Sequence, residues 1–252
     1  MFLEADVLGR SLIFGLIPAL GTSVGGLIGV LTPHSRESYM DFGLSFAAGL
    51  MLVASFTSLL IPSIELSNIY TALAGLVAGV VMILVIDKLT PHEHLEDRFE
   101  GPAKYRGRVK TLYLMVFALL IHNIPEGMAV GAGSALEFEK GLALSVAIAI
   151  QDVPEGFAVA YPLMGLTRSR FKALSIAVLS GFSETLASVL TGLVIEISQG
   201  LIPFILALAA GAMIYVVSDE VIPETHKYGH EDVATLGFVA GFVTMLFLDS
   251  LA

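Results

Sequence analysis

Two short motifs repeat one polar pattern inside apolar stretches of the chain. They are His122-Asn123-Ile124-Pro125-Glu126-Gly127 and Gln151-Asp152-Val153-Pro154-Glu155-Gly156. Residues four apart in a helix lie on one face, so His122 stacks with Glu126, and Gln151 stacks with Glu155. The amide or carboxylate three residues before each glutamate shares a neighbouring face. If the two helices face each other, each glutamate lies between two ligand sets, which predicts a site that could bridge two cations.

The proline in each motif adds a second feature. Pro125 and Pro154 donate no backbone hydrogen bond and clash with the carbonyl four residues earlier, so both helices should kink. The carbonyls of Ile121 and Ile150 thereby lose their usual partner. In a membrane such groups are tolerated only where protein, water or an ion satisfies them, so the kinks also favour a polar site.

Four acidic residues fall inside apolar stretches, namely Glu126, Asp152, Glu155 and Glu184. An ionised residue at the centre of a bilayer costs about 2.5–3.5 kcal/mol on insertion scales, so four would cost roughly 10 kcal/mol if simply summed. No Lys or Arg lies near them in the sequence. Cations, protonation or a water-filled cavity must compensate these acids, and any positive charge must come from outside the protein.

The types of ligand narrow the choice of ion. Carboxylates with one imidazole, amides and a thioether suit Zn(II), Fe(II), Mn(II), Cd(II) or Co(II), whereas a dedicated magnesium or calcium site prefers oxygen throughout. The chain has no cysteine, which excludes disulfides and argues against a very tight site. We expect divalent transition-metal ions as substrate and no catalytic cofactor.

Composition points to lipid as the solvent for most of the surface. The chain has 252 residues, of which 56% are hydrophobic and only 14% charged, against about 25% charged in soluble domains. Its mean hydropathy is +0.84. The net charge of -10 argues against a nucleic-acid partner and suits cations. We expect a multi-pass protein of the plasma (inner) membrane, without a cleavable signal peptide.

Eight segments are long and apolar enough to cross a bilayer, which takes about 20 residues. They are 10–31, 41–62, 68–89, 110–135, 138–163, 172–197, 200–221 and 233–251. The connections are short except for 90–109, which is charged and contains proline and glycine. The sequence therefore predicts an all-α membrane protein with one transmembrane domain over 1–252.

The basic residues predict the orientation, because Lys and Arg concentrate in cytoplasmic loops. Eleven of the thirteen lie after predicted helices one, three, five and seven: Arg36, Lys88, Arg98, Lys104, Arg106, Arg108, Lys110, Arg168, Arg170, Lys172 and Lys227. The opposite side has only Arg10 and Lys140. The loop 90–109 should therefore be cytoplasmic and both termini extracytoplasmic.

The chain also contains an internal repeat with an offset of 162 residues. Segment 47–51, Ala-Ala-Gly-Leu-Met, resembles 209–213, and Gly75-Leu-Val-Ala-Gly79 resembles Gly237-Phe-Val-Ala-Gly241. Five helices separate the copies, so they have opposite orientations in the membrane. This arrangement predicts two inverted three-helix repeats, helices 1–3 and 6–8, around a central pair, helices 4–5, with a substrate site near the midplane.

With these motifs the sequence resembles the ZIP (Zrt-, Irt-like protein) family of metal transporters, prokaryotic type, over nearly the whole chain. The resemblance implies a binuclear metal centre between helices two, four, five and six. One ion would bind His122, Glu126, Gln151 and Glu155, with Met51 and Glu184 nearby. The second would bind Asn123 and Asp152, with Glu126, Glu155 and Glu184 shared between the two ions.

The resemblance also implies a route from outside to the cytoplasm. At the outer ends of helices two and eight it would use Ser58, Glu65 and Asp249. At the cytoplasmic end it would use Asp87, His92, His94, Asp219, Glu220 and His226. The loop 90–109 holds only His92 and His94, unlike the longer His-rich loop of many relatives, which speaks against strong metal sensing by the loop.

We therefore expect transport of zinc, and also of iron, cadmium, manganese or cobalt, across the plasma membrane into the cytoplasm. Alternating access is the favoured mechanism, and channel-like conduction remains open. An intramembrane metalloenzyme is disfavoured because the sequence has no His-Glu-x-x-His. A proton-coupled carrier of organic or anionic solutes would need a basic or amide-rich clamp. GxxxG-like spacings allow close helix packing within a protomer or in a homodimer.

Overall fold

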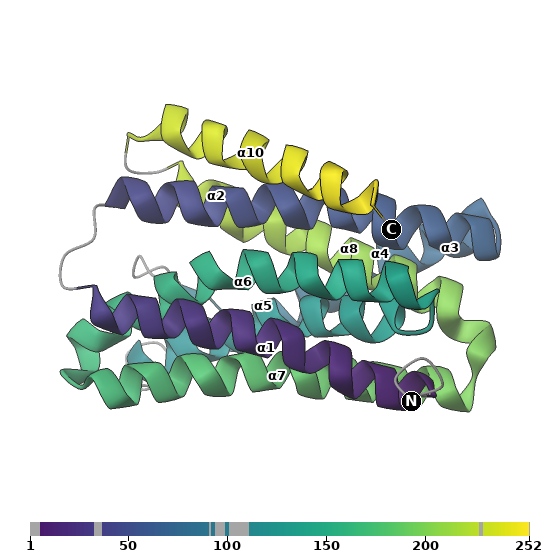
Figure 1. Ribbon diagram of the computed structural model, residues 1–252, viewed down its shortest axis with the longest axis horizontal. Coiled ribbons are helices and arrows are strands. Elements are labelled where there is room, and N and C mark those ends of the chain that lie inside the picture. The colour runs from purple at the N-terminus through teal and green to yellow at the C-terminus, as the bar shows by residue number, and fades with distance from the viewer. Residues whose placement is uncertain are drawn as a thin grey trace.

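Helices make up most of the computed structural model, which describes residues 6–32, 37–90, 92–93, 99–100, 111–226 and 229–251. Long helical rods lie side by side (Figure 1). They are α1 (Val7–Leu31), α2 (Glu37–Ala54) continued by the π-helix η1 (Ser55–Leu60) and α3 (Ile61–Leu66), α4 (Ile69–Leu89), α5 (Thr111–Gly133), α6 (Phe138–Thr167), α7 (Arg170–Ile197), η3 (Gln199–Leu201) with α8 (Ile202–Val216), the π-helix η4 (Val217–Val221) and α9 (Ile222–Thr225), and α10 (Glu231–Asp249).

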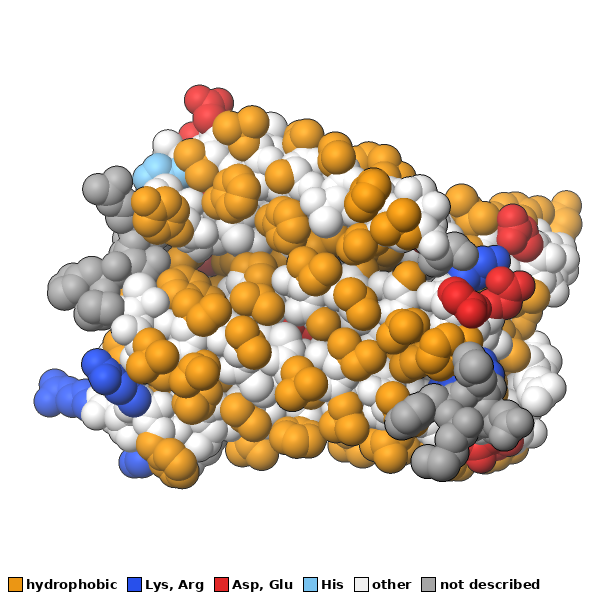
Figure 2. Space-filling model, in the orientation of Figure 1, with side chains coloured by type: hydrophobic (Ala, Val, Ile, Leu, Met, Phe, Trp, Pro, Cys, Tyr) orange, Lys and Arg blue, Asp and Glu red, His pale blue; other side chains and the backbone are white. Residues whose placement is uncertain are grey.

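The expected all-α membrane fold is confirmed. Among the described residues, seven helical rods are long and apolar enough to cross a membrane, and α5, with 23 residues, is the eighth long rod. Within the expected loop 90–109, β1 (His92–Glu93) pairs antiparallel with β2 (Phe99–Glu100), which the sequence did not predict. Figure 2 shows apolar side chains over the middle of one face, with most charged side chains at its two ends, as a lipid environment requires.

Capping residues fix where several helices begin. Asp6 accepts a hydrogen bond from Gly9 N at 2.7 Å at the start of α1, and the Asn68 side chain accepts from two backbone amides at the start of α4. Ser169 caps α7 in the same way. Such caps satisfy donors that would otherwise be unpaired in the first turn. The connections between rods can therefore be short.

The rods divide into two bundles. The site bundle consists of α1, α5, α6 and α7, in which α1 packs against α6 and α7, and α5 packs against α7. The second bundle consists of α2, α4, α8 and α10 with their short extensions, in which α2 packs against α10, and α4 against α8. The bundles meet mainly where α2 contacts α6 and α5 contacts α8. Figure 1 shows α2 and α10 along one side of α6, with α1 and α7 on the other.

Contacts between the two halves of the chain are reciprocal at the offset of 162 residues. Gly79 of α4 lies against the backbone carbonyl of Leu208 on α8, and Gly241 of α10 lies against that of Phe46 on α2. Each residue of the first contact is 162 positions from its counterpart in the second. The π-helices η1 and η4 also begin 162 residues apart, at Ser55 and Val217. This reciprocity is what an inverted repeat requires, and it supports the predicted arrangement.

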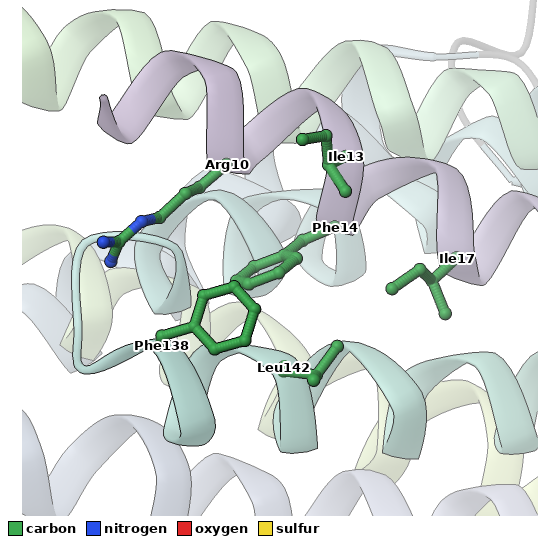
Figure 3. A pocket seen from close by; sticks show the side chains of 6 residues that line it. All are labelled: Arg10, Ile13, Phe14, Ile17, Phe138 and Leu142. Carbon is green, nitrogen blue, oxygen red and sulfur yellow. The ribbon is translucent and has the colours of Figure 1, made fainter. Parts of the chain in front are cut away.

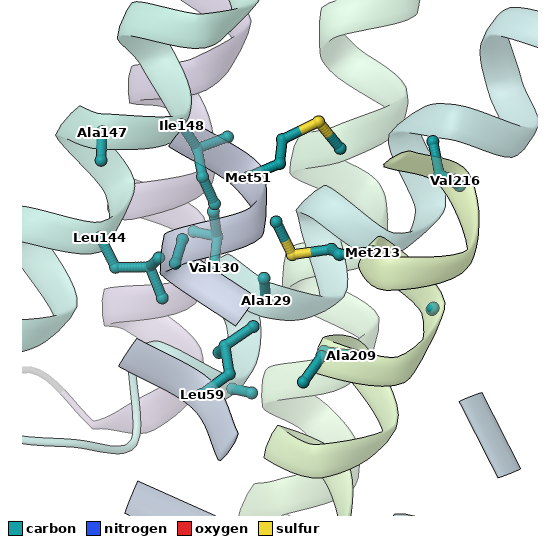
Figure 4. Close-up of a cluster of buried hydrophobic side chains, with 14 of the residues drawn as sticks. Met51, Leu59, Ala129, Val130, Leu144, Ala147, Ile148, Ala209, Met213 and Val216 are labelled. Atoms are coloured by element: carbon teal, nitrogen blue, oxygen red, sulfur yellow. The ribbon is translucent and has the colours of Figure 1, made fainter. Parts of the chain in front are cut away.

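A buried apolar cluster lies between the bundles (Figure 4). It includes Met51, Leu59, Ala129, Val130, Leu144, Ala147, Ile148, Ala209, Met213 and Val216. On α5 and α6 the residues named here lie beyond the polar motifs, toward the end of the protein that carries Arg10, where α1 begins, whereas Ile121 of the same cluster lies before the first motif. We call this end the Arg10 end. The named residues of α5 and α6 therefore lie between the polar motifs and the Arg10 end.

Candidate metal centre

Three carboxylates converge where α5 faces α6. Glu126, Asp152 and Glu155 each offer one carboxylate oxygen, and these oxygens lie within 4.8 Å of one another. Glu126 and Asp152 are buried and Glu155 is half-buried. Three negative charges this close repel each other strongly in a buried site. A divalent cation would neutralise part of this charge.

Several oxygens in this region are buried without a hydrogen-bond partner. They are Glu126 Oε2, Gln151 Oε1, both carboxylate oxygens of Asp152, and Glu184 Oε2. The side-chain nitrogen of Gln151 donates to Glu126 Oε1 at 2.7 Å. The amide oxygen of Gln151 is left without a hydrogen-bond partner. A buried polar atom without a partner costs about 1–3 kcal/mol. Oxygens of this kind are the ligands that a divalent ion would coordinate, so the donor set fits such an ion.

Glu184 reaches the cluster from α7. It is buried, it lies next to the Asp152 carboxylate, and it accepts a hydrogen bond from Thr22 Oγ1 on α1 at 3.1 Å. When both acids are ionised, neither supplies a proton to the other. The fourth predicted acid therefore adds to the same negative charge. The family resemblance implies that Glu184 is a metal ligand, and this role stays a prediction.

His122 contacts a residue that the sequence did not pair with it. Its Nε2 contacts the carboxylate of Glu220 in η4 of the second bundle. The imidazole still lies in the electrostatic neighbourhood of Glu126 and Asp87. His122 is not among the three acids whose oxygens converge, and its printed partner belongs to the other bundle. Its role as a metal ligand stays a prediction.

Asn123 lies in the site bundle with its amide directed at α7, where Nδ2 donates to the backbone carbonyl of Ser180 at 2.7 Å. Met51, by contrast, is buried in the apolar cluster together with Met213 (Figure 4). Its role as a ligand stays a prediction.

The residues predicted for the route fall at both ends of the molecule. At the Arg10 end, Ser58 Oγ donates to Asp249 Oδ1 at 3.0 Å, and Glu65 is exposed. At the opposite end, Asp87 and Glu220 are buried.

Two further route residues with described side chains lie near that opposite end, outside the carboxylate cluster. Asp219 is exposed, and His226 contacts the Ile222 carbonyl at 3.0 Å. His92 lies in β1, whose side chains are not described, and His94 lies outside the described residues.

Sequence reasoning missed three hydroxyl residues, Thr22, Ser180 and Ser183, which contact Glu184 or Asn123. The only signal was their spacing on α7, where Ser180, Ser183 and Glu184 lie three and four residues apart on one face. It also missed His230 at the start of α10, whose Nδ1 lies 2.8 Å from Asp41 Oδ2 on α2.

A separate pocket opens near the Arg10 end between α1 and α6 (Figure 3). It is lined by Arg10, Ile13, Phe14, Ile17, Phe138 and Leu142. The Arg10 guanidinium lies 5.9 Å from the centre of the Phe138 ring. None of the predicted metal ligands lines this pocket, so it is distinct from the carboxylate cluster.

The family model and the relatives described here are all named as zinc transporters. Residues 102–249 match the family model described as ZIP Zinc transporter. The chain is 41% identical to Zinc transporter ZIPB of Bordetella bronchiseptica over 262 aligned positions, covering 96% of this chain and 81% of that protein. It is 33% identical to Zinc transporter GufA of Myxococcus xanthus, covering 96% and 98%. It is 34% identical to Zinc transporter ZupT of Corynebacterium aurimucosum, covering 91% and 92%.

Proposed function

The chain belongs to the ZIP zinc transporter family, and from this we propose that it carries zinc and related divalent metal ions across the plasma membrane into the cytoplasm through a two-ion site inside the site bundle. The observation that carries this proposal is the buried cluster of Glu126, Asp152 and Glu155. Relatives named zinc transporters cover almost the whole chain, which supports zinc as the main substrate. Iron, cadmium, manganese and cobalt suit the same ligands.

We propose two ion positions. The first uses Glu126, Gln151 and Glu155, with His122 beside them. The second uses Asn123, Asp152 and Glu184. Glu126 and Glu155 lie near the Asp152 carboxylate, so they can be shared between the ions. Four acids can balance the charge of two divalent cations, which supports two ions rather than one.

Acids in this number also favour transport over catalysis. A hydrolytic metal site needs an open coordination position, an activated water and a general base. Here the carboxylates exceed what one hydrolytic metal requires, and they come from helices that are otherwise mostly apolar. We propose that the ion is cargo and that the protein is not an enzyme.

The polar residues beside the carboxylate cluster favour release of the ion at the end opposite Arg10. The apolar cluster with Met51 and Met213 closes the site on the Arg10 side. On the other side, His122 contacts Glu220, and Asp87 lies nearby. Carboxylates and imidazole give an ion successive ligands toward that end. With this end cytoplasmic, as the basic residues predict, the state described here is closed to the outside and directed toward the cytoplasm.

The division into bundles supports alternating access as the mechanism. All four acids belong to the site bundle, whose helices are joined by side chains that bond to neighbouring backbones. Ser145 donates to the Phe14 carbonyl at 2.6 Å, Thr185 to the Gly15 carbonyl at 2.7 Å, and Ser188 to the Ser11 carbonyl at 2.8 Å. Such bonds favour movement of the site bundle as one body against the second bundle. The ligand set would then stay intact while its exposure changes.

Uptake into liposomes tests the proposal. The purified protein is reconstituted, and entry of Zn(II) and Cd(II) is measured for the parent, His122→Ala and Glu155→Ala. The matched control is Glu139→Gln, which removes an exposed acid from the same helix as Glu155. We expect uptake by the parent and the control and loss of uptake in the two site variants. A parent that moves no divalent metal, or site variants that equal it, would overturn the proposal.

A further inference from the structure

The side-chain amide of Asn123 is oriented by α7. Its Nδ2 lies 2.7 Å from the Ser180 carbonyl oxygen, 2.7 Å from Ser180 Oγ and 3.2 Å from Ser183 Oγ. A backbone carbonyl only accepts hydrogen bonds, so the amide nitrogen and not the amide oxygen must face α7. The oxygen Oδ1 is thereby turned away from α7. Oxygen is the atom through which a side-chain amide binds a cation.

Ser183 fixes the direction of this network. Its Oγ donates to the Ser180 carbonyl at 2.6 Å, which uses the single hydroxyl proton. The lone pairs of Ser183 Oγ are then available to the amide nitrogen of Asn123. A flipped amide would set two acceptor oxygens against each other at the Ser180 carbonyl. Ser180 and Ser183 together allow one orientation of the Asn123 amide.

Thr22 performs the same task for Glu184 from α1. Its Oγ1 lies 3.1 Å from Glu184 Oε1 and 3.2 Å from the Pro18 carbonyl oxygen. Hydrogen bonds to ionised acceptors are the stronger ones. Whenever Glu184 is ionised, the Thr22 hydroxyl therefore donates its hydrogen bond to Glu184 and not to the Pro18 carbonyl. This occupies Oε1. The other oxygen, Oε2, is buried without a hydrogen-bond partner and stays available to an ion.

We propose that Thr22, Ser180 and Ser183 are positioning residues for the second ion. None of them is a ligand, but each fixes which oxygen of Glu184 or Asn123 is offered to the ion. The inference rests on the proposed two-ion site and names the residues that create its second position. All three belong to the site bundle, so their contacts travel with the ligands during transport.

Removal of one hydroxyl should affect one ion and spare the other. Thr22→Val keeps the shape of the side chain and deletes the hydroxyl, whereas Thr22→Ser keeps the hydroxyl. A hydrogen bond to a charged group is strong enough that its loss weakens binding by about tenfold or more. The matched control is Ser23→Ala, because the Ser23 hydroxyl bonds only to the Ala19 carbonyl of its own helix, at 2.6 Å.

The experiment is isothermal titration of Zn(II) into the purified full-length protein in detergent, with the thermal midpoint of the metal-free protein as a folding check. We expect two binding phases in the parent, Thr22→Ser and Ser23→Ala. In Thr22→Val one phase should weaken at least tenfold while the other is unchanged. The double variant Ser180→Ala, Ser183→Ala removes the two hydroxyl acceptors of the Asn123 amide and leaves only the Ser180 backbone carbonyl, so the same phase should weaken. This variant decides the matter if Thr22→Val does not fold.

The outcomes separate the inference from the proposed function. Two unchanged phases in Thr22→Val and in the double variant overturn the inference and leave the transporter standing. Equal weakening of both phases also overturns it, because a positioning role predicts a selective effect. A parent with a single phase removes the second ion position, and with it the inference. A parent that binds no Zn(II) removes the proposed function as well.

Discussion

Thr22 of α1 and Glu184 of α7 share a hydrogen bond of 3.1 Å although they are 162 residues apart in the chain. This separation equals the offset that relates Gly79 to Gly241, so the bond joins equivalent positions of the two halves. One member is a hydroxyl and the other an acid. At this contact the two halves of the predicted repeat differ in chemistry, and only the second half supplies a charged side chain.

Zn(II) should stabilise the folded protein through the carboxylate cluster. A ligand that binds only the folded state at a hundred times its dissociation constant stabilises it by about 2.7 kcal/mol. Asp152→Asn removes one charge next to Glu126 and Glu155, so most of the gain in thermal midpoint should be lost. Glu139→Gln, an exposed change on the same helix, should retain it.

The measurement is thermal unfolding in detergent with Zn(II), with a chelator, and with Zn(II) restored. A stabilisation by zinc that is as large in Asp152→Asn as in the parent would contradict the assignment of the cluster.

The polar face on each of α5 and α6 could be predicted because its signal is local. A helix fixes the relation between residues three and four apart, so the two motifs imply a shared polar face before any fold is known. Long apolar stretches similarly imply the spans, and the all-α membrane fold is confirmed. Glu184 stood out as an acid in an apolar stretch, but its role as a ligand was expected only through the family resemblance, since nothing local links it to Asp152.

Other contacts could not be predicted because they join distant segments through groups that have no sequence pattern. His122 and Glu220 are 98 residues apart and belong to different bundles. Thr22 and Ser180 look like ordinary helix hydroxyls, which commonly bond to their own backbone. Their contacts depend on how α1 and α7 pack, and that packing appears only in the folded protein.

Close contact between α1 and α6 predicts a large effect of one added methyl group. A Cβ at Gly156 would overlap the Thr22 backbone carbonyl, whereas a Cβ at Gly165 of the same helix would meet no atom within 4 Å. Overpacking costs about 1–3 kcal/mol, so Gly156→Ala should lower the thermal midpoint clearly. Gly165→Ala should leave it unchanged or raise it, because alanine favours a helix by up to about 1 kcal/mol. Equal midpoints would contradict this packing.

The inverted repeat predicts equal effects at two distant glycines. A Cβ at Gly79 would overlap the Leu208 carbonyl, and a Cβ at Gly241 would overlap the Phe46 carbonyl. Gly79→Ala and Gly241→Ala should therefore lower the free energy of unfolding by similar amounts, about 1–3 kcal/mol each. Denaturant titration of both variants in detergent measures this. A large loss in one variant alone would argue against equivalent packing of the two halves.

The contact between His122 and Glu220 predicts energetic coupling across the bundles. His122→Ala, Glu220→Gln and the double variant form a double-mutant cycle, and residues in direct contact usually couple by about 0.5–3 kcal/mol. We expect the free energies of unfolding of the single variants not to add. Additive effects would mean that the contact does not link the bundles in the folded protein.

Gly43 of α2 offers a test of movement between the bundles. A Cβ at this position would lie 2.9 Å from Cβ of Pro154 on α6, so Gly43→Ala places a methyl group between the two bodies and not within either. If the site bundle moves against the second bundle during transport, this contact should slow uptake of Zn(II) several-fold while the binding isotherm for Zn(II) stays that of the parent.

Gly156→Ala gives the contrast, because its clash lies inside the site bundle and should lower thermal stability first. The measurement is the maximal uptake rate into liposomes beside the affinity in detergent. An added methyl group on a fixed channel wall would not touch the carboxylates. An unchanged uptake rate in Gly43→Ala would therefore favour conduction without relative movement of the bundles at this contact.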